Sequence, residues 1–196
     1  MIEIEQKFSL TKEQEKNLIE GSELFSDKHQ DDTYYDSADF ALTTKDIWLR
    51  KRNGEFQIKL PEHELGKKLG FSHYTEIETD DGIRENIGLH NSGNMENDLA
   101  EAGYFPIVNF TSQRRSYRIG PFRIDLDITN FDYEIAEIEI MVEDQESRQA
   151  AEEQIREFAI SKGLEIKPIH GKVLEYINRN NPIHYKALED AGVLWM

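Results

Sequence analysis

Hydrophobic and polar residues alternate with a period of two along most of the chain, a pattern typical of β-strands with one apolar face. Asn53-Gly54 and Gly120-Pro121 interrupt the alternation as tight turns. The pattern predicts eight strands, over residues 2–8, 32–36, 47–52, 55–60, 72–79, 111–119, 122–128 and 134–142.

Helical segments lie between and after these strands. Thr11 and Gln14 form a capping box, Asp80 is a candidate cap, and Gly163 is typical of a helix end. The helices are expected at residues 11–20, 80–87, 95–102, 146–162, 172–179 and 182–191. This order predicts a single α+β domain over residues 1–196 with one antiparallel sheet, while the helices at about 146–192 pack on it or form a lid. A polar loop is expected at residues 61–70.

The polar faces of the predicted strands carry charges that are segregated by sign. Carboxylates pair at Glu3/Glu5, Glu76/Glu78, Asp125/Asp127 and Glu137/Glu139, and guanidinium groups pair at Arg50/Arg52. A solvated sheet face also carries charge, and for any single strand this is the simpler explanation. A solvated face would mix the signs, however, so the whole set favours a functional surface.

Eight antiparallel strands can close into a barrel whose interior holds side chains or one small ligand. With the charged faces inside and helices packed on the apolar outside, the interior combines carboxylates with Arg and Lys. Carboxylates bind hard cations, and Arg and Lys bind phosphate oxygens. The sequence therefore predicts a closed barrel that binds magnesium and a small-molecule polyphosphate.

Composition narrows the possible partners. The formal net charge is -16, with 39 acidic and 23 basic residues, which disfavours nucleic acid and anionic membranes. The chain has no cysteine, which excludes disulfides, thiolate zinc sites and cysteine nucleophiles. No leader segment and no apolar run of about 18 residues is found. We therefore expect a cytoplasmic monomer.

Two residue types allow competing interpretations. The six His residues show no H-x-H or H-E-x-x-H spacing, so a catalytic zinc site is disfavoured. Trp48 is either a core residue or, because Arg50 lies two positions later on the same strand face, a stacking platform for a ligand.

An ordered series of motifs resembles the CYTH superfamily, the triphosphate tunnel metalloenzymes. The series runs Glu3-Ile4-Glu5-Gln6-Lys7 (E-x-E-x-K), Tyr34-Tyr35-Asp36-Ser37, Trp48-Leu49-Arg50-Lys51-Arg52, Ile58-Lys59, Tyr74-Thr75-Glu76-Ile77, Arg114-Arg115-Ser116, Asp125-Leu126-Asp127 and Glu137-Ile138-Glu139. It covers nearly the whole chain and is most similar to the thiamine triphosphatase branch. Gly171-Lys172-Val173-Leu174-Glu175-Tyr176 extends the similarity into the C-terminal segment.

The resemblance implies an eight-stranded tunnel and roles for individual residues. Phosphate contacts are implied for Lys7, Arg50, Arg52, Lys59, Arg115 and Lys172. Metal contacts are implied for Glu3, Glu5, Glu76, Asp125, Glu137 and Glu139, with Mg²⁺ as the ion and Mn²⁺ as a substitute. Lys59 and Tyr34 match a pair that helps to activate water, and Trp48 matches the residue that stacks on thiamine. Strand parity does not decide which of Arg114, Arg115 and Arg118 faces inward.

Several functions use such an interior. Hydrolysis of thiamine triphosphate to thiamine diphosphate and phosphate is the first hypothesis, and inorganic tripolyphosphate is its close rival. Cyclisation of ATP, as in class IV adenylate cyclases, needs an adenine pocket that is not identified. A non-catalytic polyphosphate-binding module is the remaining alternative. If a Lys acts as the base, its pKa must be depressed, and the rate should rise into the alkaline range.

Overall fold

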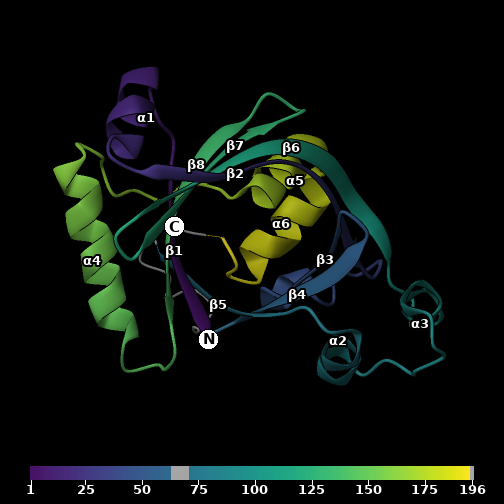
Figure 1. The fold of residues 1–196 in the computed structure, drawn as a ribbon. Coiled ribbons are helices and arrows are strands. Elements are labelled where there is room, and N and C mark those ends of the chain that lie inside the picture. Colours follow the sequence, from purple (N-terminus) through teal and green to yellow (C-terminus); the bar gives the residue numbers. More distant parts are fainter. Residues whose placement is uncertain (63–70, 195–196) are drawn as a thin grey trace.

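The computed structural model describes residues 1–62 and 71–194, and within them eight strands close into an antiparallel barrel. The strands are β1 (Ile2–Phe8), β2 (Glu23–Asp36), β3 (Trp48–Arg52), β4 (Glu55–Pro61), β5 (Phe71–Ile77), β6 (Phe105–Ile119), β7 (Phe122–Thr129) and β8 (Glu134–Val142). Their order around the barrel is β1-β5-β4-β3-β2-β6-β7-β8 (Figure 1). The predicted closed α+β barrel is confirmed.

Two strands are much longer than the alternation predicts. β2 begins at Glu23 and not at residue 32, and β6 begins at Phe105 and not at residue 111. The two strands pair with each other from Glu23↔Arg118 to Asp36↔Phe105. The first part of β2 is mostly exposed to solvent on both faces, so its polar and apolar residues follow no period-two pattern.

The polar loop expected at residues 61–70 lies mostly outside the described residues. Pro61 is the last residue of β4, so the strand continues one position beyond its predicted end. Residues 63–70 are among those that the structure does not describe.

The helices lie close to their expected positions. They are α1 (Lys12–Ile19), α2 (Asp80–Ile87), α3 (Met95–Glu101), α4 (Arg148–Ser161), α5 (Lys172–Asn180) and α6 (Pro182–Asp190), with a 3₁₀ turn η1 at Thr43–Lys45. The capping box of Thr11 and Gln14 is present. The expected cap at Asp80 is wrong: the side chain of Thr79 accepts the backbone N–H of Gly82, and Asp80 is the first helical residue. None of the described helices is long and apolar enough to cross a membrane.

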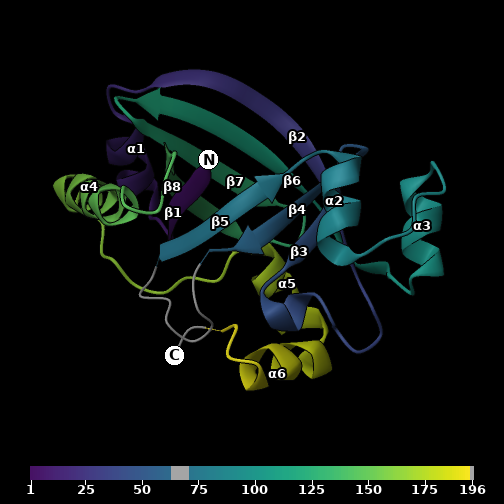
Figure 2. The ribbon, with the colours of Figure 1, turned by 90° about the horizontal axis from the view of Figure 1, so that it is seen from below.

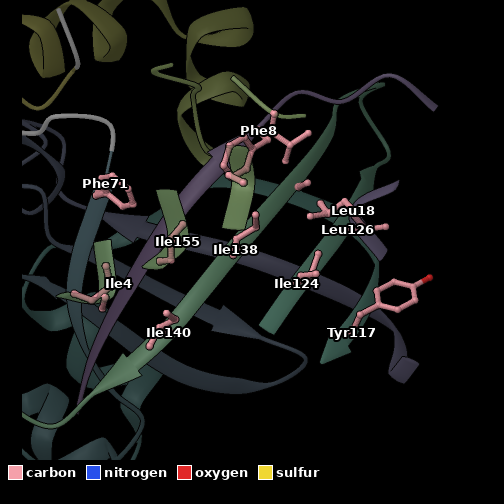
Figure 3. Close-up of a cluster of buried hydrophobic side chains, with 14 of the residues drawn as sticks. Ile4, Phe8, Leu18, Phe71, Tyr117, Ile124, Leu126, Ile138, Ile140 and Ile155 are labelled. Carbon is pink, nitrogen blue, oxygen red and sulfur yellow. The ribbon is translucent and has the colours of Figure 1, made fainter. Parts of the chain in front are cut away.

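The apolar strand faces point outward and pack under helices. Ile4, Ile124 and Ile138, from β1, β7 and β8, are fully buried in one cluster with Leu18 of α1 and Ile155 of α4 (Figure 3). α4 lies along the outside of the barrel against β1 and β8 (Figure 1). Because neighbouring side chains alternate between faces, the charged residues of the same strands point into the barrel.

The C-terminal helices pack against inward-facing aromatic residues. Tyr34, Trp48 and Phe110 share one buried cluster with Ile177 of α5 and Leu188 of α6. Both helices appear inside the outline of the barrel in Figure 1 and below the strands in Figure 2. This packing brings the first turn of α5 to the interior of the barrel.

Candidate active site

The barrel encloses a cavity of about 280 Å³ that is lined mainly by charged side chains. Seven basic residues face it: Lys7, Arg50, Arg52, Lys59, Arg114, Arg123 and Lys172. Six acidic residues face it: Glu3, Glu5, Glu76, Glu78, Glu137 and Glu139. The lining thus has slightly more basic than acidic groups, although the whole chain carries a formal net charge of -16. Cations are concentrated here, as binding of a polyanion by an acidic protein requires.

Arg114 lies at the centre of a buried ion-pair network. Its guanidinium donates to both oxygens of Asp127 at 2.8 and 2.5 Å, to Asp125 at 2.5 Å and to Glu137 at 2.7 Å. Asp125 and Asp127 are each 1% exposed. Although burial opposes it, the charges of Arg114 and Lys7 hold the pKa of Glu137 below its usual value. The network fixes a guanidinium fork at the cavity wall.

Lys172 is the first residue of α5 and extends this network. Its ammonium lies 2.9 Å from Asp127, close to Gln30 and Ser112. Burial and the nearby charge of Arg114 lower the pKa of Lys172 to about 8. A bound phosphate would favour the charged form of this group further by direct contact.

The first turn of α5 touches the opposite wall of the cavity. A Cβ atom added to Gly171, the N-cap residue, would lie 3.1 Å from Cε of Lys7. A glycine at this position therefore lets the helix approach a cation of β1 closely. The positive end of the helix dipole adds to the cationic character of this part of the cavity.

Each remaining basic group of β3 and β4 has a carboxylate partner. Arg52 forms a bidentate pair with Asp32 at 2.6 and 2.9 Å, and Arg50 donates to Glu76 at 2.6 Å. Lys59 lies 2.6 Å from Glu3. These pairs hold the side chains in place without a ligand, so a triphosphate would meet donors that are already oriented.

The environment of Lys59 differs from the one expected for a base. Although burial favours the neutral amine, the charges of Glu3 and Glu5 raise the pKa of Lys59 above its usual value. Burial raises the pKa of Tyr34, which also interacts with Arg50. The expected depression of a lysine pKa by neighbouring cations is therefore found at Lys172 and not at Lys59.

Carboxylates from β1 and β8 crowd together at another part of the cavity. Burial and the charge of Glu3 raise the pKa of Glu139 to about 8, and burial raises the pKa of Glu5. Among the described residues, no group of three acidic, His or Cys side chains forms a ready-made metal site. The crowding nonetheless favours a cation, which would relieve the repulsion between these carboxylates.

Most of the predicted site residues line the cavity, and two do not. Arg115 points outward, where it donates to Glu15 of α1 at 2.7 Å and lies near the hydroxyl of Tyr117. The inward position on β6 belongs to Arg114. Arg115 has the same parity as Tyr117 and Ile119, whose apolar side chains belong to the outer face; this signal could have identified the orientation from the sequence.

Asp125 also lies outside the cavity lining. One of its carboxylate oxygens accepts from Arg114 at 2.5 Å, and the other accepts from Arg123 at 3.0 Å. Both oxygens are thus engaged by guanidinium groups. In this arrangement Asp125 orients two basic residues and does not present a free carboxylate to the cavity.

Other cavity residues were missed by the sequence analysis. Arg123 and Tyr74 lie on the charged faces of their strands, so their parity was a signal. Asp127 and Asp32 hold Arg114 and Arg52 but are separated from them in the sequence, so only strand pairing reveals the partnership.

One wall of the cavity is uncharged. Tyr34, Trp48 and Tyr74 line it together with Val173 and Leu174 of α5. Trp48 stands edge-on to Tyr34, with ring centroids 6.3 Å apart and an angle of 86°. The cavity therefore offers a charged region beside an aromatic one.

Comparisons with known proteins agree with this geometry. The chain is 26% identical to human thiamine-triphosphatase over 209 positions, which cover 96% of this chain and 89% of the human protein. The thiamine-triphosphatase of Macaca fascicularis has the same identity and coverage.

Solved structures share the fold. The PH1819 protein of Pyrococcus horikoshii OT3 has a TM-score of 0.69 at 19% identity, covering 91% of this chain and 99% of its own. HpAC1 from Hippeastrum, for which a dominant triphosphatase activity is described, has a TM-score of 0.59 at 18% identity, covering 91% of this chain and 95% of its own. The CYTH domain matches residues 1–167, and with this match over most of its length the chain belongs to the CYTH family.

Proposed function

We propose that this protein hydrolyses the terminal phosphoanhydride of thiamine triphosphate with the help of Mg²⁺, giving thiamine diphosphate and phosphate. The observation that carries the proposal is the enclosed cavity with seven basic and six acidic side chains. Enclosing so many charges is costly unless each is paired, and a polyanion together with a cation pairs both sets. The broader assignment as a triphosphatase of the CYTH family rests on the domain match and the relatives.

CYTH proteins are triphosphate tunnel metalloenzymes that need a divalent metal, and the carboxylates here fit that need. Mg²⁺ is usually held by one or two carboxylates together with substrate phosphates and water, so it does not require a ready-made cage. Crowding at Glu3, Glu5 and Glu139 makes these residues the best candidates to hold it, with Glu76 and Glu137 nearby in the lining. When bound, the ion would neutralise phosphate charge and help to position a water; Mn²⁺ is a possible substitute.

The basic side chains have separate tasks in this proposal. Arg50, Arg52 and Arg114 present planar guanidinium groups that suit phosphate oxygens. Lys7 and Lys172 lie at the cavity wall on β1 and α5 and supply compact charges. Together they orient the triphosphate and stabilise the negative charge that develops on the transferred phosphoryl group.

Lys59 and Tyr34 remain our candidates for groups that contact the reacting phosphate, since both line the cavity. Lys59 enters the reaction as a cation in this proposal, because the neighbouring carboxylates keep its pKa above the usual value. Its contribution is then electrostatic.

The choice of thiamine triphosphate rests on two observations. The relatives matched over most of this chain are named thiamine-triphosphatase. The aromatic wall beside the charged region offers a place for an organic group, with Trp48 as the stacking surface. Inorganic tripolyphosphate is the second candidate, because the charged region alone is sufficient to bind it.

We also propose that the chain forms a single domain and acts as a cytoplasmic monomer. The absence of cysteine is compatible with a reducing compartment. Size-exclusion chromatography with light scattering measures the molar mass in solution and so tests whether the protein is a monomer.

The deciding experiment measures phosphate release from thiamine triphosphate, inorganic tripolyphosphate and ATP, with Mg²⁺ and with EDTA. We expect thiamine triphosphate to be preferred, EDTA to abolish turnover, and Lys59→Ala to lower kcat by about 10²-fold, as for loss of a charge-stabilising group. Lys51→Ala is the matched control, because Lys51 pairs with Glu96 on the outer face. A preference for tripolyphosphate would reject the thiamine assignment, and formation of cyclic AMP from ATP would reject hydrolysis.

A further inference from the structure

Asp46 is a buried acid that contacts the aromatic wall of the cavity. It is 1% exposed and sits between η1 and β3. Its Oδ1 atom accepts a hydrogen bond from Nε1 of Trp48 at 2.9 Å and another from the hydroxyl of Tyr74 at 2.9 Å. A single carboxylate oxygen thus connects two aromatic side chains of the cavity wall.

The two aromatic residues come from strands that are not neighbours. Trp48 lies on β3 and Tyr74 on β5, and β4 runs between them. Lys59 of β4 pairs in register with Trp48, and its ammonium lies 5.8 Å from the centroid of the Tyr74 ring. Asp46 therefore fixes the aromatic wall next to a cation of the phosphate-binding region.

The backbone at Asp46 is held in an uncommon conformation. Its φ is +61°, in the left-handed region, and its N–H donates to the carbonyl of Thr43 at 2.9 Å. Apart from glycine, Asn and Asp enter this region most readily. Glycine would also fit this backbone conformation but would lack the carboxylate that accepts from Trp48 and Tyr74.

The hydrogen bonds also influence what the wall can bind. The indole N–H and the phenol O–H both point to a negative group, which increases the electron density of their rings. Electron-rich ring faces attract cations, with Trp the strongest among the aromatic side chains. A wall built in this way suits a positively charged heterocycle.

We propose that Asp46 is a positioning residue that holds Trp48 and Tyr74 as a binding wall for a cationic aromatic heterocycle attached to the triphosphate. This inference rests on the proposed function, because the thiazolium ring of thiamine triphosphate is such a group. Inorganic tripolyphosphate has no organic group and does not use the wall. Asp46 therefore determines substrate choice and leaves the phosphate chemistry unchanged.

The test compares Asp46→Ala and Asp46→Asn with wild type, using steady-state kinetics on thiamine triphosphate and on inorganic tripolyphosphate. For Asp46→Ala we expect KM for thiamine triphosphate to rise about tenfold, which matches the range of cation–π energies, while kcat and all values for tripolyphosphate stay within about twofold. Asp46→Asn keeps an acceptor oxygen without the charge and should give an intermediate KM. Asp39→Asn is the control, because Asp39 is an exposed acid of the same segment.

The outcomes separate the two proposals. If wild type hydrolyses thiamine triphosphate and Asp46→Ala loses activity equally on both substrates, or on neither, the positioning role is overturned and the proposed function stands. If wild type hydrolyses only tripolyphosphate, the proposed substrate fails, and the wall for a cationic ring fails with it. A KM effect confined to thiamine triphosphate, partly rescued by Asn, supports the positioning role.

Discussion

Arg114 is the residue on which the deep part of the cavity depends. Three buried carboxylates converge on it, from Asp125, Asp127 and Glu137, at 2.5 to 2.7 Å. Its neighbour Arg115 forms one ion pair with Glu15 on the partly exposed outer surface. Two adjacent arginines thus have opposite orientations and very different electrostatic environments.

This contrast predicts different effects for matched substitutions. Arg114→Gln leaves buried carboxylates without their partner, so we expect a loss of about 3–5 kcal/mol in the free energy of unfolding and a loss of triphosphate hydrolysis. Arg115→Gln removes a surface pair and should cost about 0–1 kcal/mol with activity retained. Urea unfolding and phosphate release from tripolyphosphate measure both effects. Loss of activity in the Arg115 variant alone would contradict the assigned orientation.

The residue scale also shows where sequence reasoning reached its limit. The alternation correctly predicted that Glu3, Glu5 and Lys7 share a face, because parity is a local property of a strand. It did not predict that the pKa of Lys59 is raised while the pKa of Lys172 is lowered. Lys59 lies among carboxylates, whereas Lys172 is deeply buried beside Arg114 as well as Asp127, and both environments arise only because strands and a helix distant in the sequence meet in the barrel.

At the scale of elements, a buried hydrogen-bond chain joins α6 to the barrel. The hydroxyl of Thr43 lies 2.6 Å from Asp36 and 2.7 Å from Nε2 of His184. Because the carboxylate only accepts, the hydroxyl donates to Asp36 and the imidazole N–H donates to the hydroxyl. The ring of His184 stacks on Phe40 at 3.9 Å between centroids. This chain fastens α6 to η1, directly before the segment that carries Asp46 and Trp48.

The same chain predicts a pH-dependent contribution to stability. Burial lowers the pKa of His184 below its usual value of 6.5, and Asp36 opposes the shift only partly. The folded state therefore binds fewer protons at this site than the unfolded state, and its stabilising contribution, present above about pH 6.5, is lost as pH falls through the folded pKa. His184→Gln should be less stable than wild type by about 1–3 kcal/mol at pH 7.5, and the gap should narrow towards pH 5.

Chemical denaturation at several pH values between 7.5 and 5 measures this gap. Both proteins share all other titrating groups, so the difference between them isolates His184. A gap that stays constant with pH would show that the histidine contributes only by packing.

At the scale of the whole molecule, closure of the barrel brings carboxylates and basic side chains close together in a small volume. β1 completes the ring by pairing with β5 on one side and β8 on the other. Closure brings Glu3 and Glu5 next to Glu139 and opposite the cations of β3 and β4. The free protein balances these charges internally, and a ligand has to replace those pairs.

This balance predicts that Mg²⁺ and a triphosphate stabilise the protein cooperatively. Each alone would leave either carboxylates or cations uncompensated, whereas both together pair the two sets. Thermal melting with Mg²⁺, with a non-hydrolysable triphosphate analogue and with both should give a combined rise in Tm larger than the sum of the separate rises. Sodium chloride at equal ionic strength is the control. An additive result would argue against a shared metal–triphosphate site.

The alternation of polar and apolar residues and the order of the motifs were enough to predict the strands, their two faces and the family, because these are local features of the sequence. β2 and β6 were predicted too short, because the first part of β2 is mostly exposed to solvent and the first part of β6 is a largely apolar run, so neither segment alternates with a period of two. Only the folded structure shows that Asp125 is engaged by two arginines and that Asp46 connects Trp48 with Tyr74. These relations depend on which strands become neighbours and where the helices pack, and neither is encoded in the pattern of a single strand.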